Sequence, residues 1–231
     1  MAIQALSQTI THLTKQGRFR QAADREKEIG QIYLQELNDL KKACESYERA
    51  GEWYSQEDAQ AYVPRPLYSF HLFELLSRTA NACFKDAADL HADLEEYPQA
   101  IARYEQVADG SLSSALTKYS VKEYWLRSCL CALAMGVSGF IMNCSYGPDE
   151  ALQDSVTAKR NLTKYSSLDT TFSSTREAKF VGIITDALEA GDAETFTAAV
   201  YEYDQVMKLD NWKTNILLKI KKGIQEEPII L

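Results

Sequence analysis

The chain contains 231 residues, of which 45% are hydrophobic and 25% are charged, a balance typical of a folded protein and not of a disordered one. Its formal net charge of −8 argues against general nucleic-acid binding. Glycine and proline are scarce, at 10 and 5 residues, which favours helices over a β-sandwich or barrel. No apolar run reaches the roughly 18 residues that a membrane span needs, and the first residues do not resemble a secretory signal.

The predicted elements, in chain order, are all helices. They cover about 2–16, 19–36, 39–56, 79–94, 97–108, 115–135, 150–164, 173–190, 193–208 and 211–225. Gly17 and Gly191 follow predicted helix ends, where glycine is favoured. The residues 173–175, followed by Glu177, are typical of a capped helix start. The fold class predicted from these signals is all-α.

A short pattern recurs along the chain: an alanine, a tyrosine four residues later, then an acid, then alanine or valine. The copies are Ala43-Tyr47-Glu48-Ala50, Ala100-Tyr104-Glu105-Val107 and Ala199-Tyr203-Asp204-Val206. Their apolar members lie at i, i+4 and i+7 and therefore share one face of a helix. Alternation of small and large residues suits close helix packing, and repeats of this kind are typical of helix-pair solenoids.

Two segments interrupt this regularity. Residues 61–78 are rich in aromatic residues and contain two prolines, and residues 136–149 hold three of the ten glycines. We predict both as insertions, either as loops or as translated non-coding sequence. The resulting organisation is helical hairpins over 1–135, interrupted at 61–78, an insertion at 136–149, and C-terminal helices with a tail over 150–231.

No arrangement of residues indicates catalysis. The chain lacks the glycine-rich, metal-protease, esterase and calcium-loop motifs, and its three histidines, His12, His71 and His91, are far apart in the sequence. The five cysteines form no CxxC pair, which predicts buried, reduced thiols of a cytosolic protein. We therefore expect no catalytic residue, no metal and no cofactor, and interpret the chain as a scaffold that binds proteins.

Charge is unevenly placed near the C-terminus. Residues 186–204 carry six acids and no lysine or arginine, whereas residues 208–222 carry five lysines and one acid. Glu226 and Glu227 then precede an apolar end, Ile229 to Leu231. Two interpretations are open: a solvated helix with a frayed tail, or an acidic surface that steers a basic partner and an apolar anchor that holds it.

Several runs are specific enough to suggest a family. They are RFRQAA, YERAGEWY, ARYEQV, EYDQVMKLDNWKT and LLKIKK. Together they resemble the soluble NSF attachment protein (alpha-SNAP) family, in its fungal form. The resemblance implies a right-handed solenoid of TPR-like helical hairpins with a C-terminal helical bundle. It also implies a non-enzymatic adaptor that is cytoplasmic and peripheral on endomembranes.

The resemblance implies two partners. Members of this family bind the assembled SNARE four-helix bundle, of the syntaxin type, and recruit the hexameric ATPase NSF, which disassembles it. Members also begin with further helices and an apolar loop that contacts membranes. We expect this chain to be an N-terminally shortened member whose membrane contact is weakened.

Site residues follow from the same resemblance. Arg18, Lys122 and Arg176 match basic positions of the SNARE-binding face. Asp24, Ala82 and Asp86 stand where animal members have lysine, and we expect their neighbours to supply the positive charge. These neighbours are Arg25, Lys27 and Lys85.

The NSF-binding residues implied by the resemblance are acidic residues and an apolar terminus. They are Asp186, Glu189, Glu226, Glu227 and Leu231, and Asp149 or Glu150 is expected to match one further acid. A generic TPR-type module that binds a peptide tail is the alternative, although the sequence shows no clamp of lysine, asparagine and arginine for it. An enzyme with a site assembled from distant helices is the third interpretation.

Overall fold

The computed structural model describes residues 2–60, 68–114, 116–142 and 148–225, with side chains described in 2–56, 77–114, 116–135 and 155–224. Within these ranges the chain forms α-helices and two 3-10 turns and no strand, so the predicted all-α class is confirmed. Two compact units divide the chain, Met1–Val121 and Lys122–Leu231.

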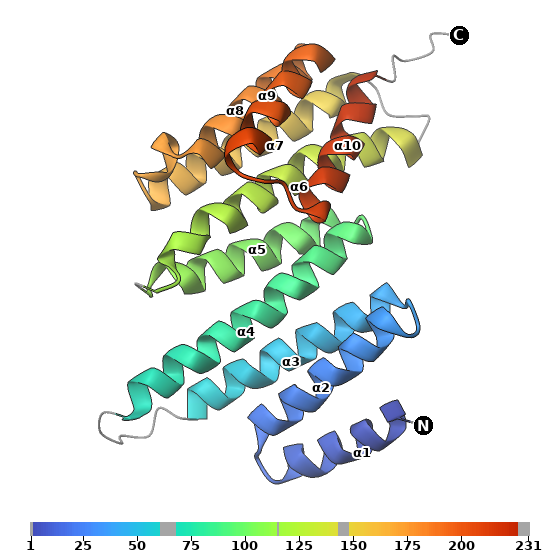
Figure 1. Cartoon of the computed structure of the whole chain (residues 1–231), viewed down its shortest axis with the longest axis vertical. Helices are drawn as coiled ribbons and strands as arrows, with labels where there is room; N and C mark the ends of the chain where they lie inside the picture. The colour runs from blue at the N-terminus through green and yellow to red at the C-terminus, as the bar shows by residue number, and fades with distance from the viewer. Residues whose placement is uncertain (1, 61–67, 115, 143–147, 226–231) are drawn as a thin grey trace. The chain divides into compact units, whose positions relative to one another are not determined.

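The first unit is a succession of helices in which each packs against the next (Figure 1). Its elements are α1 (Ala2–Lys15), α2 (Phe19–Gln35), α3 (Leu40–Gln60), α4 (Tyr68–Asp93), α5 (Tyr97–Leu112) and the 3-10 turn η1 (Lys118–Ser120). The recurring alanine and tyrosine positions face inward here, since Ala43 and Tyr47 of α3 and Ala100 and Tyr104 of α5 are buried. The repeat therefore marks the packing faces of the hairpins, as predicted.

The second unit contains five helices and one 3-10 turn in its described part. They are α6 (Val121–Met142), α7 (Pro148–Leu168), η2 (Phe172–Ser174), α8 (Arg176–Glu189), α9 (Ala193–Val206) and α10 (Asn211–Gln225). Its core is aromatic: the Trp125 ring of α6 stacks on Tyr165 of α7 with centroids 5.1 Å apart, and Phe172 meets Trp125 edge-on at 4.8 Å. Val206, the last member of the third repeat, is exposed because α9 ends at this residue.

Helix ends follow local chemistry. The Thr175 hydroxyl accepts a hydrogen bond from the Ala178 amide at 3.2 Å and caps α8, which confirms the predicted capped start. Asp192 caps α9 by accepting from the amides of Glu194 and Thr195 at 3.0 and 2.9 Å.

Several helix boundaries differ from the prediction, most of all the start of α4 and both ends of α6, which begins at Val121 and not near 115. Helix α4 begins at Tyr68, well before the expected start near 79, because residues 68–78 contain no glycine or proline that would stop a helix. Helix α6 continues to Met142, past the expected end near 135. The segments predicted as insertions are thus partly helical, and their remaining residues, 61–67 and 143–147, lie outside the described residues.

Burial makes the described thiols unreactive. Cys44, Cys83, Cys129 and Cys131 are buried and form no disulfide, as predicted. Desolvation raises the pKa of Cys44 to about 12 and that of Cys83 to about 11. Because the thiolate is the reactive form, these side chains serve as small core residues.

Close packing at Gly51 makes a testable prediction. A Cβ at this position would lie 2.6 Å from the Phe84 ring, whereas a Cβ at Gly182 would meet no atom within 4 Å. We expect Gly51→Ala to lower the free energy of unfolding by about 1–3 kcal/mol despite the better helix propensity of alanine. Gly182→Ala, the control, should raise it by about 0.5–1 kcal/mol. Urea denaturation followed by circular dichroism measures both, and a stabilised Gly51→Ala would contradict this packing.

Candidate functional site

Helix α8 carries predicted residues of both sites on one exposed face. Arg176, Lys179, Ile183 and Asp186 follow one another at helical spacing and are all exposed, Ile183 by 46%. At 1.5 Å per residue, Arg176 and Asp186 are separated by about 15 Å along the helix axis. The face is therefore basic at its start, apolar in its middle and acidic towards its end.

This charge order opposes the helix dipole. Cations at a helix N-terminus and anions at its C-terminus are each unfavourable by about 0.3–1 kcal/mol at the surface. Arg176 opens α8, and Asp186 and Glu189 lie in its last turns, so the exposed charges do not stabilise the helix. Glu177, the favourable acid of the first turn, is buried instead.

Lys122 is bound by that buried acid at the first turn of α8, the turn that Arg176 begins. The Lys122 ammonium of α6 lies 3.0 Å from the Glu177 carboxylate, whose side chain is only 3% exposed. Two of the predicted SNARE-binding cations, Lys122 and Arg176, thus belong to the surroundings of the first turn of α8. Lys122 also neutralises a buried carboxylate, a structural role that the sequence analysis missed.

The other predicted cations belong to the first unit. Arg18 is exposed immediately before α2, Arg25 pairs with Glu28 at 2.6 Å, and Lys85 pairs with Asp89 at 2.7 Å. Lys27 is partly buried. Arg25 and Lys85 are thus held by acids of their own helices.

Two acids of this unit occupy positions where a cation was expected. The Asp24 carboxylate of α2 accepts a hydrogen bond from the Tyr54 hydroxyl of α3. Burial raises the pKa of Asp86, and the positive charges of Lys85 and Lys27 offset this in part. Two of the three cations predicted to replace the missing charge, Lys27 and Lys85, therefore lie near Asp86, which partly neutralises them.

The acidic end of α8 is paired with α7. The Lys159 ammonium lies 3.1 Å from the Asp186 carboxylate and 2.6 Å from that of Glu189. These contacts raise the pKa of Lys159, and hydrogen bonds from Lys159 and Ser155 lower the pKa of Glu189. Asp186 and Glu189 are exposed neighbours on the surface of α8. The other predicted NSF-binding residues, Glu226, Glu227 and Leu231, lie outside the described residues, as do the side chains of 149 and 150.

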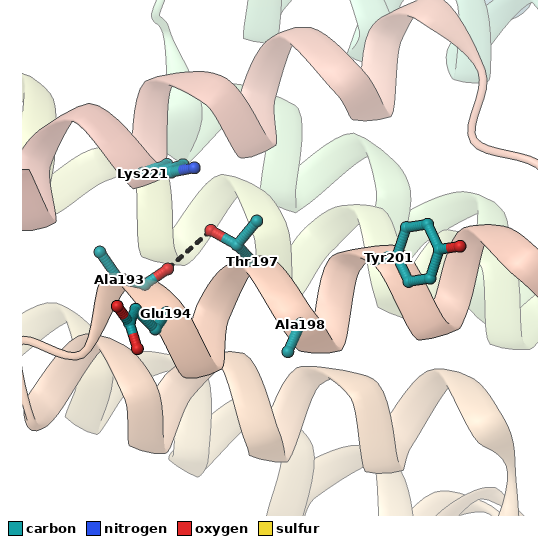
Figure 2. A pocket seen from close by; sticks show the side chains of 6 residues that line it. All are labelled: Ala193, Glu194, Thr197, Ala198, Tyr201 and Lys221. Carbon is teal, nitrogen blue, oxygen red and sulfur yellow. Dashed lines mark hydrogen bonds between the residues drawn. The ribbon is translucent and has the colours of Figure 1, made fainter.

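A shallow hollow of about 520 Å³ runs along α9 beside α10 (Figure 2). It is lined by Ala193, Glu194, Thr197, Ala198, Tyr201 and Lys221. The Thr197 hydroxyl of the lining donates a hydrogen bond to the Ala193 carbonyl at 2.6 Å. It is therefore engaged within helix α9. The lining contains no histidine or cysteine.

Neither a metal centre nor a membrane span is found in the described part of the chain. Over the side chains that the structure places, no three histidine, cysteine or acidic residues are grouped so as to hold a metal ion. Among the described helices, none has the length and apolar character required to cross a bilayer.

Comparison with known proteins identifies the family. The model of the soluble NSF attachment protein (SNAP) family matches residues 1–66, 70–143 and 150–225. The chain belongs to the SNAP family. It is 57% identical to the vesicular-fusion protein SEC17 of Coprinopsis cinerea over 228 residues, which cover 99% of this chain and 67% of the relative.

More distant relatives belong to the same family. The alpha-soluble NSF attachment protein of Saccharomyces cerevisiae is 33% identical over 226 residues, covering 98% of this chain and 66% of the relative. That of Homo sapiens is 33% identical over 224 residues, covering 97% and 64%. The chain thus spans about two thirds of the length of these relatives. The expected family is confirmed, and with it the TPR-like helical architecture.

Part of the SNAP-type run EYDQVMKLDNWKT joins a polar cluster around the buried side chain of Arg127. Arg127 of α6, only 5% exposed, donates to the Asp210 carboxylate and, from Nε at 3.0 Å, to Glu123. Lys213 bonds Glu123 at 2.7 Å, and the Arg127 guanidinium lies 4.6 Å from the centre of the Trp212 ring. This cluster fixes the start of α10 against α6.

The ionisation of Asp210 reflects the same cluster. Burial opposes its charge, but the Lys213 backbone amide and the positive charges of Arg127 and Lys213 outweigh that effect and lower its pKa. A carboxylate with a lowered pKa stabilises the fold above its unfolded pKa, and that contribution is lost as the pH falls through the folded value.

The ion pair between Lys122 and Glu177 predicts unequal costs for two charge reversals. Lys122→Glu places a second carboxylate against the buried Glu177 and should lower the free energy of unfolding by about 3 kcal/mol. Arg176→Glu changes an exposed residue, so its free energy of unfolding should stay within about 0.5 kcal/mol of the parent value. Thermal and urea unfolding measure both. Restoration of stability to Lys122→Glu by Glu177→Gln would support the assignment, and equal stability of the two single variants would contradict it.

Proposed function

We propose that this chain is the part of a non-enzymatic adaptor in vesicle-mediated transport that binds assembled SNARE complexes and recruits NSF. The names of its relatives, vesicular-fusion protein and NSF attachment protein, support this role. The observation that carries the proposal is the exposed face of α8, where cations and acids occupy opposite ends of one helix. Such a face suits simultaneous contact with an acidic and a basic surface.

The basic end of α8 suits the SNARE bundle, a syntaxin-type four-helix assembly with an acidic surface. Arg176 and Lys179 are exposed there, and Lys122 adds a third cation that retains 31% of its side-chain exposure. Ile183, one turn further, offers an apolar contact. Complementary charge gives fast association that weakens with salt, and a small apolar contact lengthens the bound state.

The acidic end suits the basic surface of NSF. Asp186 and Glu189 lie within reach of one ammonium, so they present two carboxylates at one point of the surface. We assign the tail residues Glu226, Glu227 and Leu231 to the same partner, with the apolar terminus stimulating its ATPase activity. The adaptor would act at the cytoplasmic face of endomembranes.

The basic end predicts a selective loss of SNARE binding. Arg176→Glu should weaken binding to the assembled bundle by about ten-fold, because it replaces an attraction by a repulsion without disturbing the fold. Arg160→Glu is the matched control, since it reverses an exposed arginine of α7. Pull-down and titration with soluble SNARE bundles, at low and physiological salt, measure the effect. Equal binding by both variants would contradict the site, and binding of isolated C-terminal peptides in preference to bundles would favour the peptide-binding alternative.

The acidic end predicts a selective loss of NSF binding. Asp186→Asn combined with Glu189→Gln removes both charges at nearly constant shape, and should weaken NSF capture by an immobilised chain about ten-fold. SNARE binding should stay at the level of the parent. Surface-based binding of the NSF hexamer measures the first effect, and undiminished capture would remove this pair from the site.

A further inference from the structure

The acidic pair of α8 is already occupied by a cation of the same chain. Lys159 contacts both carboxylates, at 3.1 Å to Asp186 and 2.6 Å to Glu189, from the neighbouring helix α7. The group of three side chains therefore presents a net charge of −1 to a partner, in place of −2. A basic surface that docks here must compete with the Lys159 ammonium for the two carboxylates.

We propose that Lys159 is an intramolecular competitor that sets how tightly the acidic pair binds a basic protein surface. The inference rests on the proposed function, because it concerns the same two carboxylates. Lys159 of α7 would thus regulate a site of opposite charge.

The exposure of the bridge makes competition feasible. The side chains of Lys159 and Asp186 are 49% and 72% exposed, so an incoming ammonium or guanidinium reaches Asp186 without prior movement of the helices. Exposed ion pairs contribute little to stability, so exchange of one cation for another is easy. Arginine in a partner is favoured over Lys159, since its planar fork bonds a carboxylate with two parallel hydrogen bonds.

The packing of α7 against its neighbours does not depend on this bridge. Ala158, next to Lys159, is fully buried, and Tyr165 lies in the aromatic core with its hydroxyl 2.7 Å from that of Ser128. These apolar and aromatic contacts hold α7 in place. The bridge instead relieves the repulsion among Asp186, Glu189 and the carbonyl end of α8, an effect that a bound partner cation supplies equally well.

Removal of the Lys159 charge should therefore strengthen NSF binding. In the full chain, Lys159→Gln removes the competing ammonium from both carboxylates and should raise the affinity of the immobilised chain for the NSF hexamer by about two- to five-fold. Lys159→Arg keeps a cation in place and should bind as the parent does. Arg160→Gln is the matched control, because it removes the same charge from the adjacent residue of α7.

Combination with the acidic-pair variants separates this inference from the proposed function. In the background of Asp186→Asn and Glu189→Gln, Lys159→Gln should have no greater effect than Arg160→Gln, because the competitor has lost its target. If the acidic-pair variant binds NSF as the parent does, the proposed site is wrong and the inference falls with it. If that variant loses binding while Lys159→Gln gains no more than Arg160→Gln, the inference alone is overturned.

Discussion

The ion pair between Lys122 and Glu177 is the constraint on which the proposed site depends. A carboxylate that is 3% exposed needs a nearby cation, and the cation comes from α6 while the acid belongs to the first turn of α8. The pair therefore fixes where α8 begins relative to α6 and holds Lys122 at the first turn of α8. The fold already requires Lys122 to pair with Glu177. Any attraction of Lys122 for an acidic partner is an additional effect of that placement.

The polar cluster around the buried Arg127 gives the same unit a second anchor. Its members, Glu123, Asp210 and Lys213, come from α6 and from the start of α10, so that the cluster ties together segments far apart in the sequence. Buried charges of this kind favour one arrangement of helices, because any other leaves a charge unpaired. A rigid unit suits an adaptor, since the separation of its binding surfaces is then constant.

Much of the fold was predictable because the signals are local. The alanine and tyrosine repeat marked the inward faces of α3 and α5, and Thr175 and Asp192 mark helix starts through hydrogen bonds within three residues. The early start of α4 was missed because repeat spacing was given more weight than the helix propensity of residues 68–78.

The site was only partly predictable. Asp186 and Glu189 are three residues apart and their proximity on a helix follows from their spacing. Lys159 and Lys122 reach α8 from other helices, 27 and 55 residues from their respective partners Asp186 and Glu177, and no sequence pattern joins them. Charge compensation between helices is a property of the packed unit, so it emerged only from the structure.

Opposite ends of the exposed α8 face are proposed to serve two partners at the same time. A competition experiment with the immobilised chain tests it directly: NSF is bound first, and soluble SNARE bundle is then added without ATP hydrolysis. The bundle should add to the assembly and leave NSF bound. Displacement of NSF by the bundle would contradict it.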